Sequence, residues 1–233
     1  MTRQIVAMGG GGFSVESDNV LLDEYIIRQA GTENPQVCFL PTASGDAQEY
    51  VTSFYSAFGR FTCRPSHLSL FALPTRDIEG FLLDKHVVYV GGGNTRSLLA
   101  LWREWGIDAI LRKAWERGVV LAGISSGAVC WYEQGLSDYF PGEFNVLGCL
   151  GILPGSFCPH YDSEPQRPPV YRDLVARGEL PPGIAAEDRV ALHYVDTALH
   201  AVVASRPGAL AWRVSKDGDG CREERLDPRY LGA

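Results

Sequence analysis

The stretch Val119-Val120-Leu121-Ala122-Gly123-Ile124-Ser125-Ser126-Gly127-Ala128 is the part of the sequence that decides the fold. Residues 119–122 form a short apolar run, and the next five have the pattern Gly-x-Ser-x-Gly ahead of a helix-like segment, 128–133. This is the context of a nucleophile elbow, where glycines permit a strained strand-to-helix turn that lifts a serine hydroxyl out of the sheet. The pattern predicts Ser125 as nucleophile. Ser126 is the alternative, and its backbone amide is better placed to contribute to an oxyanion hole.

Two earlier apolar runs also end in a glycine-rich turn, one in Gly9–Gly12 and the other in Gly91–Asn94. Short apolar strands that are bounded by glycine and separated by helices indicate a parallel sheet covered on both faces. Ligands bind beyond the carboxyl ends of such strands, and Gly9–Gly12 is expected as a close turn at the rim of the site. The expected strands are 4–8, 36–40, 66–70, 87–90 and 119–122, and the expected helices are 20–30, 49–58, 77–83, 97–105 and 107–117.

Beyond about residue 135 the pattern changes to loops rich in glycine and proline. Gly135–Gly155 is either a lid over the site or a surface connection. After a short helix near 170–177, alternating polarity predicts an antiparallel meander over 190–195, 198–205 and 209–214. There is no internal repeat or low-complexity linker, so a single domain over residues 1–233 is expected.

The composition limits the partners of the protein. The 233 residues carry a formal net charge of −7, and the basic residues are scattered, which argues against a nucleic-acid or membrane-surface partner. No run approaches the roughly 20 apolar residues of a membrane span, and no secretory signal is visible. The six cysteines are dispersed with no CxxC pair, which favours free thiols over a zinc site. We expect a cytoplasmic protein without a metal or another cofactor.

A serine nucleophile needs a base, and His160 is the best of the five histidines. It lies in Phe157-Cys158-Pro159-His160-Tyr161-Asp162, a loop after a Gly/Pro-rich stretch, where catalytic groups tend to be carried. The other four histidines lie within or next to strand-like segments. A carboxylate should orient the imidazole, and the spacing does not select one. The candidate acids are Asp138, Asp162, Glu164 and Glu187.

Three motifs together resemble one protein family. Val90-Gly91-Gly92-Gly93-Asn94-Thr95, then residues 123–128 and then Pro159-His160-Tyr161, in that order, resemble the aspartyl dipeptidases (peptidase E) and more distantly the cyanophycinases. The resemblance implies an α/β three-layer sandwich with a mostly parallel central sheet, of the class I glutamine amidotransferase-like, flavodoxin-related fold. It also implies Ser125 as nucleophile and His160 as base, with oxyanion donors from Gly93 or Gly92 and from Ser126. Its acid follows the histidine, which favours Glu187 over Asp138.

The function implied by this resemblance is a serine peptidase that hydrolyses dipeptides or short peptides, with an N-terminal aspartate as the family's preferred residue. Such a side chain would need a cation near the pocket. An esterase or amidase with the same mechanism, and a silent amidotransferase-like binding protein, are the alternatives. The protein would act as a monomer or homodimer. The candidate cations are Arg96, Arg167, Arg172 and Arg189.

Overall fold

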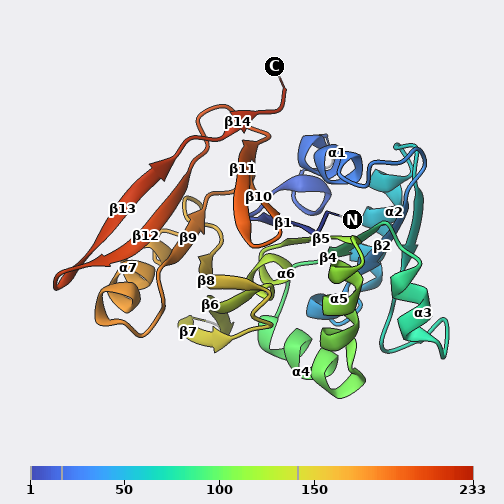
Figure 1. The fold of residues 1–233 in the computed structure, drawn as a ribbon, viewed down its shortest axis with the longest axis horizontal. Coiled ribbons are helices and arrows are strands. Elements are labelled where there is room, and N and C mark those ends of the chain that lie inside the picture. Colours follow the sequence, from blue (N-terminus) through green and yellow to red (C-terminus); the bar gives the residue numbers. More distant parts are fainter. Residues whose placement is uncertain (1, 17, 141, 233) are drawn as a thin grey trace.

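Two β-sheets form the framework of the molecule (Figure 1). The structure is a computed structural model that describes residues 2–16, 18–140 and 142–232. Its larger sheet has eight strands in the described residues, and the five strands from β1 to β3 in the order below run parallel. From one edge to the other the strands are β14 (Arg229–Tyr230), β11 (Ala198–Ala204), β10 (Val190–Val195), β1 (Gln4–Met8), β5 (Val120–Ile124), β4 (Val87–Val90), β2 (Gln36–Leu40) and β3 (Arg64–His67).

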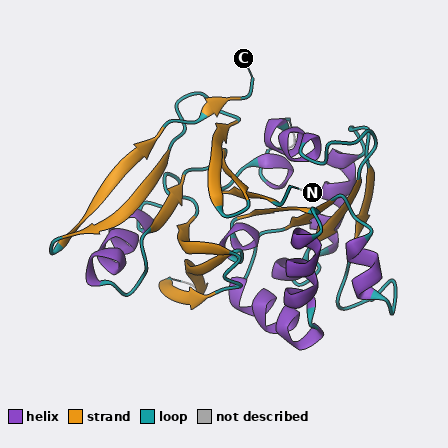
Figure 2. Ribbon diagram, in the orientation of Figure 1, coloured by secondary structure: helices purple, strands orange, loops and turns teal. Residues whose placement is uncertain are grey.

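Helices cover both faces of this sheet, as Figure 2 shows. Alternate residues of β1 face opposite ways, so Val6 and Met8 pack toward one pair of helices while Ile5 and Ala7 pack toward the other group. The three-layer α/β sandwich predicted from the sequence is therefore confirmed. The first layer holds α1 (Leu21–Arg28) and α2 (Gln48–Phe58), and the second holds α3 (Ile78–Leu83), α4 (Thr95–Trp105) and α5 (Ile107–Glu116).

The second sheet lies beside the first, and all of its strands come from the second half of the chain (Figure 1). In it β8 runs parallel to both of its neighbours, and α7 (Arg167–Arg177) packs against one face. One apolar cluster contains residues of both sheets, which supports a single domain over residues 1–233; that boundary stays a prediction. The strands are β13 (Gly220–Leu226), β12 (Ala211–Asp217), β9 (Gly183–Ala186), β8 (Leu153–Cys158), β6 (Tyr132–Phe140) and β7 (Glu143–Gly148).

The sequence prediction was wrong in the middle of the chain. The helix expected over 128–133 is only the four-residue α6 (Ser126–Val129), because the chain turns at once into β6. Gly135–Gly155 forms most of β6, all of β7 and the start of β8, apart from Pro141, which lies outside the described residues. Glycines and a proline within β6 and β8 hid these strands from a pattern-based assignment.

The predicted meander is half correct. Strands β10 and β11 do pair antiparallel, but the third segment, β12, pairs with β9 and β13 in the other sheet. The chain therefore leaves the large sheet after β11 and crosses to the small one. Alternation of polar and apolar residues predicts a strand without identifying its neighbour.

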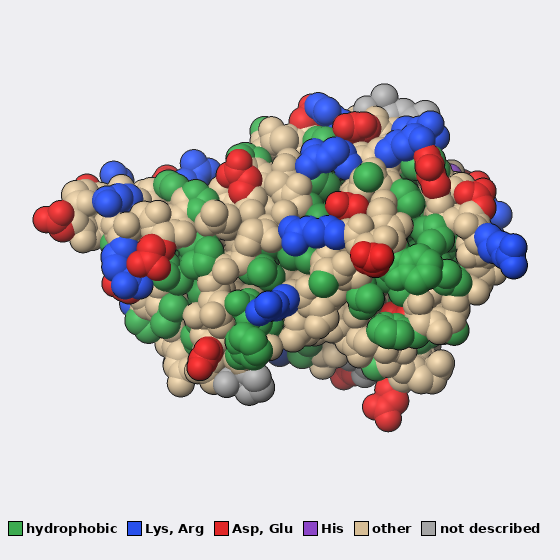
Figure 3. Space-filling view, turned by 90° about the horizontal axis from the view of Figure 1, so that it is seen from below, with side chains coloured by type: hydrophobic (Ala, Val, Ile, Leu, Met, Phe, Trp, Pro, Cys, Tyr) green, Lys and Arg blue, Asp and Glu red, His purple; other side chains and the backbone are tan. Residues whose placement is uncertain are grey.

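The surface carries both signs of charge. On the face shown in Figure 3, lysines and arginines lie among aspartates and glutamates rather than in one field. Such a face offers no concentrated basic patch to a phosphate backbone. Among the residues described, no helix is both long and apolar enough to span a membrane.

Candidate active site

Ser125 lies where β5 ends and α6 begins. Its φ of 53° and ψ of −119° are rare for a non-glycine residue and cost about 1–3 kcal/mol, which the surrounding packing must hold. Glycines make that packing possible. A Cβ on Gly123 would lie 2.0 Å from the Gly127 carbonyl oxygen, and one on Gly127 would lie 2.3 Å from the Val90 carbonyl oxygen. Both glycines of the Gly-x-Ser-x-Gly pattern are thus sterically required.

The imidazole of His160 reaches this hydroxyl from the second sheet. His160 follows β8, and its Nε2 is 2.9 Å from Ser125 Oγ. On the other side of the ring, Nδ1 is 2.7 Å from Oδ1 of Asp188. A carboxylate only accepts, so Nδ1 carries the proton and Nε2 is left as an acceptor for the serine O–H. Hydroxyl, imidazole and carboxylate therefore form one hydrogen-bonded row.

The carboxylate in this row is neither of the two acids expected from the sequence. Oε2 of Glu187 accepts a hydrogen bond from the Leu210 amide at 2.9 Å. Asp138 is paired with Arg167 at 3.1 Å. The assignment of Glu187 or Asp138 to the imidazole is thus corrected to Asp188, the residue directly after Glu187. Two adjacent acids were present in the sequence, and only the direction of their side chains separates them.

The charge state of Asp188 suits a partner of an imidazolium. Burial by itself raises the pKa of Asp188, but the interactions with His160, Ser163 and Arg189 together outweigh it and leave the pKa lowered. The backbone of Asp188 is also fixed, since its amide donates to Oδ1 of Asp162 at 2.7 Å. Asp162 in turn accepts from Arg206 at 3.0 Å through Oδ2. The acid is therefore ionised and held in place at neutral pH.

The first glycine turn supports the acid–base pair. A Cβ on Gly10 would lie 2.0 Å from Oδ1 of Asp188 and 3.0 Å from Nδ1 of His160. The Gly10 carbonyl oxygen also accepts from the Arg189 amide at 2.9 Å. Only a residue without a side chain fits there. The turn therefore lies directly against the carboxylate–imidazole contact. The sequence predicted this turn at the rim of the site, and the structure places it closer to the centre.

The oxyanion donors expected from the sequence separate into one occupied and two available amides. The Gly92 amide donates to the Tyr50 hydroxyl at 3.2 Å. Within the described residues the amides of Gly93 and Ser126 have no acceptor. The Ser126 hydroxyl donates to the Gly93 carbonyl oxygen, which ties the elbow to this turn. Gly93 has a φ of 142°, and a Cβ on it would lie 2.2 Å from the Ala43 carbonyl oxygen, so no other residue fits. The geometry thus favours Gly93 over Gly92.

Of the four candidate cations, Arg96 differs from the rest. It is exposed, lies three residues after Gly93, and stacks over the rings of Tyr139 and Phe140 at 5.1 and 5.8 Å. No carboxylate partner of Arg96 is present in the described part of the chain. The other three are held by acids: Arg167 by Asp138 and Glu164, Arg172 by Glu223, and Arg189 by Glu16.

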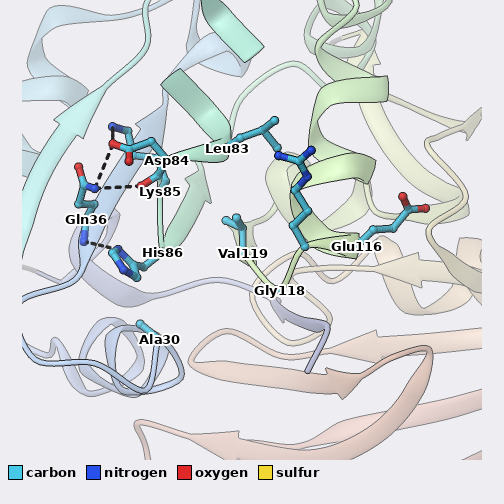
Figure 4. A pocket seen from close by; sticks show the side chains of 10 residues that line it. Ala30, Gln36, Leu83, Asp84, Lys85, His86, Glu116, Gly118 and Val119 are labelled. Carbon is cyan, nitrogen blue, oxygen red and sulfur yellow. Dashed lines mark hydrogen bonds and ion pairs between the residues drawn. The ribbon is translucent and has the colours of Figure 1, made fainter. Parts of the chain in front are cut away.

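Two of the hollows lie at opposite ends of the parallel strands of the large sheet. One, of about 560 Å³, is lined by Gln36, His86 and Val119 at the amino ends of the strands, away from Ser125 (Figure 4). The other, of about 530 Å³, adjoins the oxyanion turn through Asn94 and has the exposed Phe71 in its wall. Of these two hollows, the second lies at the carboxyl ends of the strands, where ligands bind in such sheets. The described residues hold no group of three or more His, Cys, Asp or Glu side chains arranged for a metal ion.

A serine, an imidazole and a carboxylate in one row, beyond the carboxyl end of a parallel strand and beside two available amides, define a serine hydrolase. Comparison with known proteins gives the family. Residues 5–202 match Peptidase family S51. The chain is 53% identical over 230 residues to the protein of Bacillus subtilis (strain 168) named Uncharacterized peptidase YgaJ, with 99% of this chain and 100% of that one covered. The chain belongs to peptidase family S51 and is a peptidase.

Solved structures support the fold. A peptidase from an acI-B1 Actinobacterium superposes with a TM-score of 0.75 at 17% identity, over 98% of this chain and 95% of that one. A candidate peptidase E from Listeria monocytogenes EGD-e gives a TM-score of 0.64 at 17% identity, over 97% of this chain and 100% of that one. At this identity the likeness concerns the fold alone, and it agrees with the resemblance drawn from the sequence motifs.

Proposed function

We propose that the protein hydrolyses dipeptides or short peptides with a free amino terminus through an acyl-enzyme on Ser125. The observation that carries the proposal is the row Ser125 Oγ, His160, Asp188, with contacts of 2.9 and 2.7 Å. All three residues come from one chain, so a monomer holds a complete site and a homodimer would hold two.

In the first half of the reaction, Ser125 Oγ attacks the carbonyl carbon of the scissile peptide bond, and its proton passes to Nε2 of His160. Asp188 stabilises the imidazolium that forms. The carbonyl oxygen becomes an oxyanion that the amides of Gly93 and Ser126 are placed to bind, each contributing about 3 kcal/mol to the lowering of the barrier. The C–N bond then breaks as the imidazolium gives its proton to the leaving nitrogen.

In the second half, water replaces the departed amine. It gives a proton to Nε2 of His160 and attacks the ester carbon, and the oxyanion forms again beside Gly93 and Ser126. The C–O bond to Ser125 breaks, and the imidazolium returns the proton to Oγ. The enzyme is restored. The peptide has been split into an N-terminal fragment with a new carboxylate and a C-terminal fragment with a new amino group.

We further propose a preference for an N-terminal aspartate, with Arg96 as the cation that binds its carboxylate. The support is that Arg96 is the candidate cation without a carboxylate partner in the described residues, next to the oxyanion turn. A panel of Asp-X and Asn-X dipeptides tests it, because the two substrates differ only in the charge. Arg96→Gln should lower kcat/KM for Asp-X about tenfold or more and leave Asn-X within about twofold. Equal losses on both would refute the role of Arg96.

The central test compares Ser125→Ala with Ser53→Ala, a replacement of an exposed serine on α2. The expected result is a loss of peptide turnover of several orders of magnitude for Ser125→Ala and unchanged turnover for the control. Near-normal hydrolysis by Ser125→Ala would refute the proposal. Hydrolysis of p-nitrophenyl esters without any dipeptide hydrolysis would replace it by an esterase.

The six unpaired cysteines support a reducing, cytoplasmic setting as part of the proposal.

A further inference from the structure

Tyr50 of α2 lies against the turn that would hold the oxyanion. Its hydroxyl accepts the Gly92 amide proton at 3.2 Å. Its ring lies against Gly91, where an added Cβ would come within 2.8 Å of Cε1 of Tyr50 and 3.0 Å of Cζ of Phe39. Two of the three glycines of the turn thus contact this one side chain.

Tyr50 is itself held firmly. Its ring packs edge-on against Phe39, with ring centroids 5.0 Å apart, and in a tilted arrangement against Phe13, with centroids 5.6 Å apart. Phe13 is followed by Ser14, whose Oγ donates to the Gly11 carbonyl oxygen at 3.2 Å. Burial raises the pKa of Tyr50, so the hydroxyl stays protonated at neutral pH. The Tyr50 hydroxyl therefore binds the oxyanion turn, while the Tyr50 ring packs on Phe13, which follows the first glycine turn.

The peptide groups of the turn show what this contact does. The peptide between residues 93 and 94 is fixed on both sides, because the Gly93 oxygen accepts from Ser126 and the Asn94 amide donates to the Ala43 oxygen at 2.7 Å. The peptide between residues 91 and 92 is fixed by Tyr50. The peptide between them carries the available Gly93 amide. Glycine rotates freely about both of its backbone dihedrals, so the direction of that N–H depends on the two neighbouring peptides.

We propose that Tyr50 is a positioning residue of the oxyanion hole, whose hydroxyl fixes the peptide between residues 91 and 92 so that the Gly93 amide of the next peptide points at the developing oxyanion. The inference rests on the proposed function, since it presumes acyl transfer to Ser125. It predicts a loss in the rate of the chemical step with little change in substrate binding, because the Tyr50 hydroxyl binds the Gly92 amide and so acts on the oxyanion turn.

The test compares Tyr50→Phe with Tyr55→Phe. The control removes the same atom from the same helix, where the Tyr55 hydroxyl is bound to Nδ1 of His67 at 2.8 Å, away from the site. The probe is a fluorophosphonate, which needs no knowledge of the natural substrate. Ser125 Oγ bonds to phosphorus, fluoride leaves, and the hydroxyl proton passes to His160, while charge develops on the phosphoryl oxygen at the oxyanion hole.

Tyr50→Phe should label about tenfold more slowly or worse, whereas Tyr55→Phe should label at the wild-type rate. On a dipeptide, Tyr50→Phe should lose the same factor in kcat with KM within about twofold. A Tyr50→Phe protein that labels and turns over at the wild-type rate would overturn the proposal. So would one that unfolds under the assay conditions, because the hydroxyl would then support the fold as a whole. A wild-type protein that is not labelled at Ser125 would instead refute the proposed function.

Discussion

Replacing Asp188 by Asn tests the part of the site that the sequence did not identify. The carboxylate accepts from Nδ1 of His160 at 2.7 Å, which leaves Nε2 free to take the proton of Ser125. An asparagine at this position can present its amide N–H to Nδ1. The ring would then carry its proton on Nε2, where it cannot accept another. The variant keeps the shape of the side chain and reverses the hydrogen bond.

The expected loss follows from two effects on the same ring. The wrong tautomer must be exchanged before each turnover, and the imidazolium loses a charged partner in a site where the side chains of His160 and Asp188 are only 19% and 15% exposed. In a comparable triad, the same substitution costs about 10⁴-fold in kcat, which corresponds to about 5.5 kcal/mol. We expect Asp188→Asn to lose about 10³- to 10⁴-fold in kcat on the best dipeptide, with KM changed little.

The matched control is Glu187→Gln, one residue earlier. Glu187 accepts the Leu210 amide proton through Oε2, and a glutamine oxygen can still accept it. We expect this variant to keep its turnover within about threefold of the wild type. Steady-state kinetics of both variants decide the matter, with circular dichroism to confirm folding. Full activity in Asp188→Asn, or an equal loss in Glu187→Gln, would show that the observed row does not set the rate.

Three further predictions concern residues around the site. Gly10→Ala should reduce kcat at least tenfold, because its Cβ would displace the Asp188 carboxylate; Gly148→Ala, whose Cβ meets nothing within 4 Å, should be neutral, and equal kinetics would contradict this. Ser126→Ala keeps its amide but releases the Gly93 oxygen, so kcat should fall about three- to tenfold; an unchanged kcat would exclude a role for that contact. Asp23 is fully buried, and burial raises its pKa to about 7 from an ordinary 3.8. Between these two pH values the folded state holds a proton on Asp23 that the unfolded chain has released. The free energy of unfolding that depends on this neutral carboxyl is therefore lost as pH rises toward 7. From pH 5 to 8 the free energy of unfolding should fall by about 3 kcal/mol more in the wild type than in Asp23→Asn, measured by urea titration, and parallel pH profiles would refute it.

The candidate nucleophile and base could be proposed from the sequence because their signals are local. Gly123, Ser125 and Gly127 are within five residues, and the steric need for each glycine is met inside one strand-to-helix turn. His160 lies in the short motif Pro159-His160-Tyr161, although the strand that precedes it was not predicted. The acid differs, since Glu187 and Asp188 share one loop and the choice depends on side-chain direction. That direction is set by the Asp162 carboxylate and by the Gly10 oxygen, both contributed by other parts of the chain.

The large sheet could be predicted because its strands have local signals in the sequence, and the small sheet could not. Apolar strands such as β4 and β5, buried on both faces, appear in the sequence as continuous runs. The strands of the small sheet do not, because β8 contains Pro154 and Gly155 and β6 contains Gly135. Their strand character comes from pairing with each other, which no local pattern records.

The small sheet places two of the three groups in the row. Strands β8 and β9 run parallel with Cys158 opposite Ala185, so the two strands end side by side at the same edge of the sheet. His160 and Asp188 follow these two residues by two and three positions. Ser125 belongs to the large sheet. The contact between Ser125 and His160 therefore crosses from one sheet to the other. Gly10, which follows β1 of the large sheet, packs against His160 and Asp188 at the same place. Since a displacement of about 1 Å can cost 10²-fold in rate, the turnover of this enzyme depends on how the two sheets pack against each other as much as on the groups themselves.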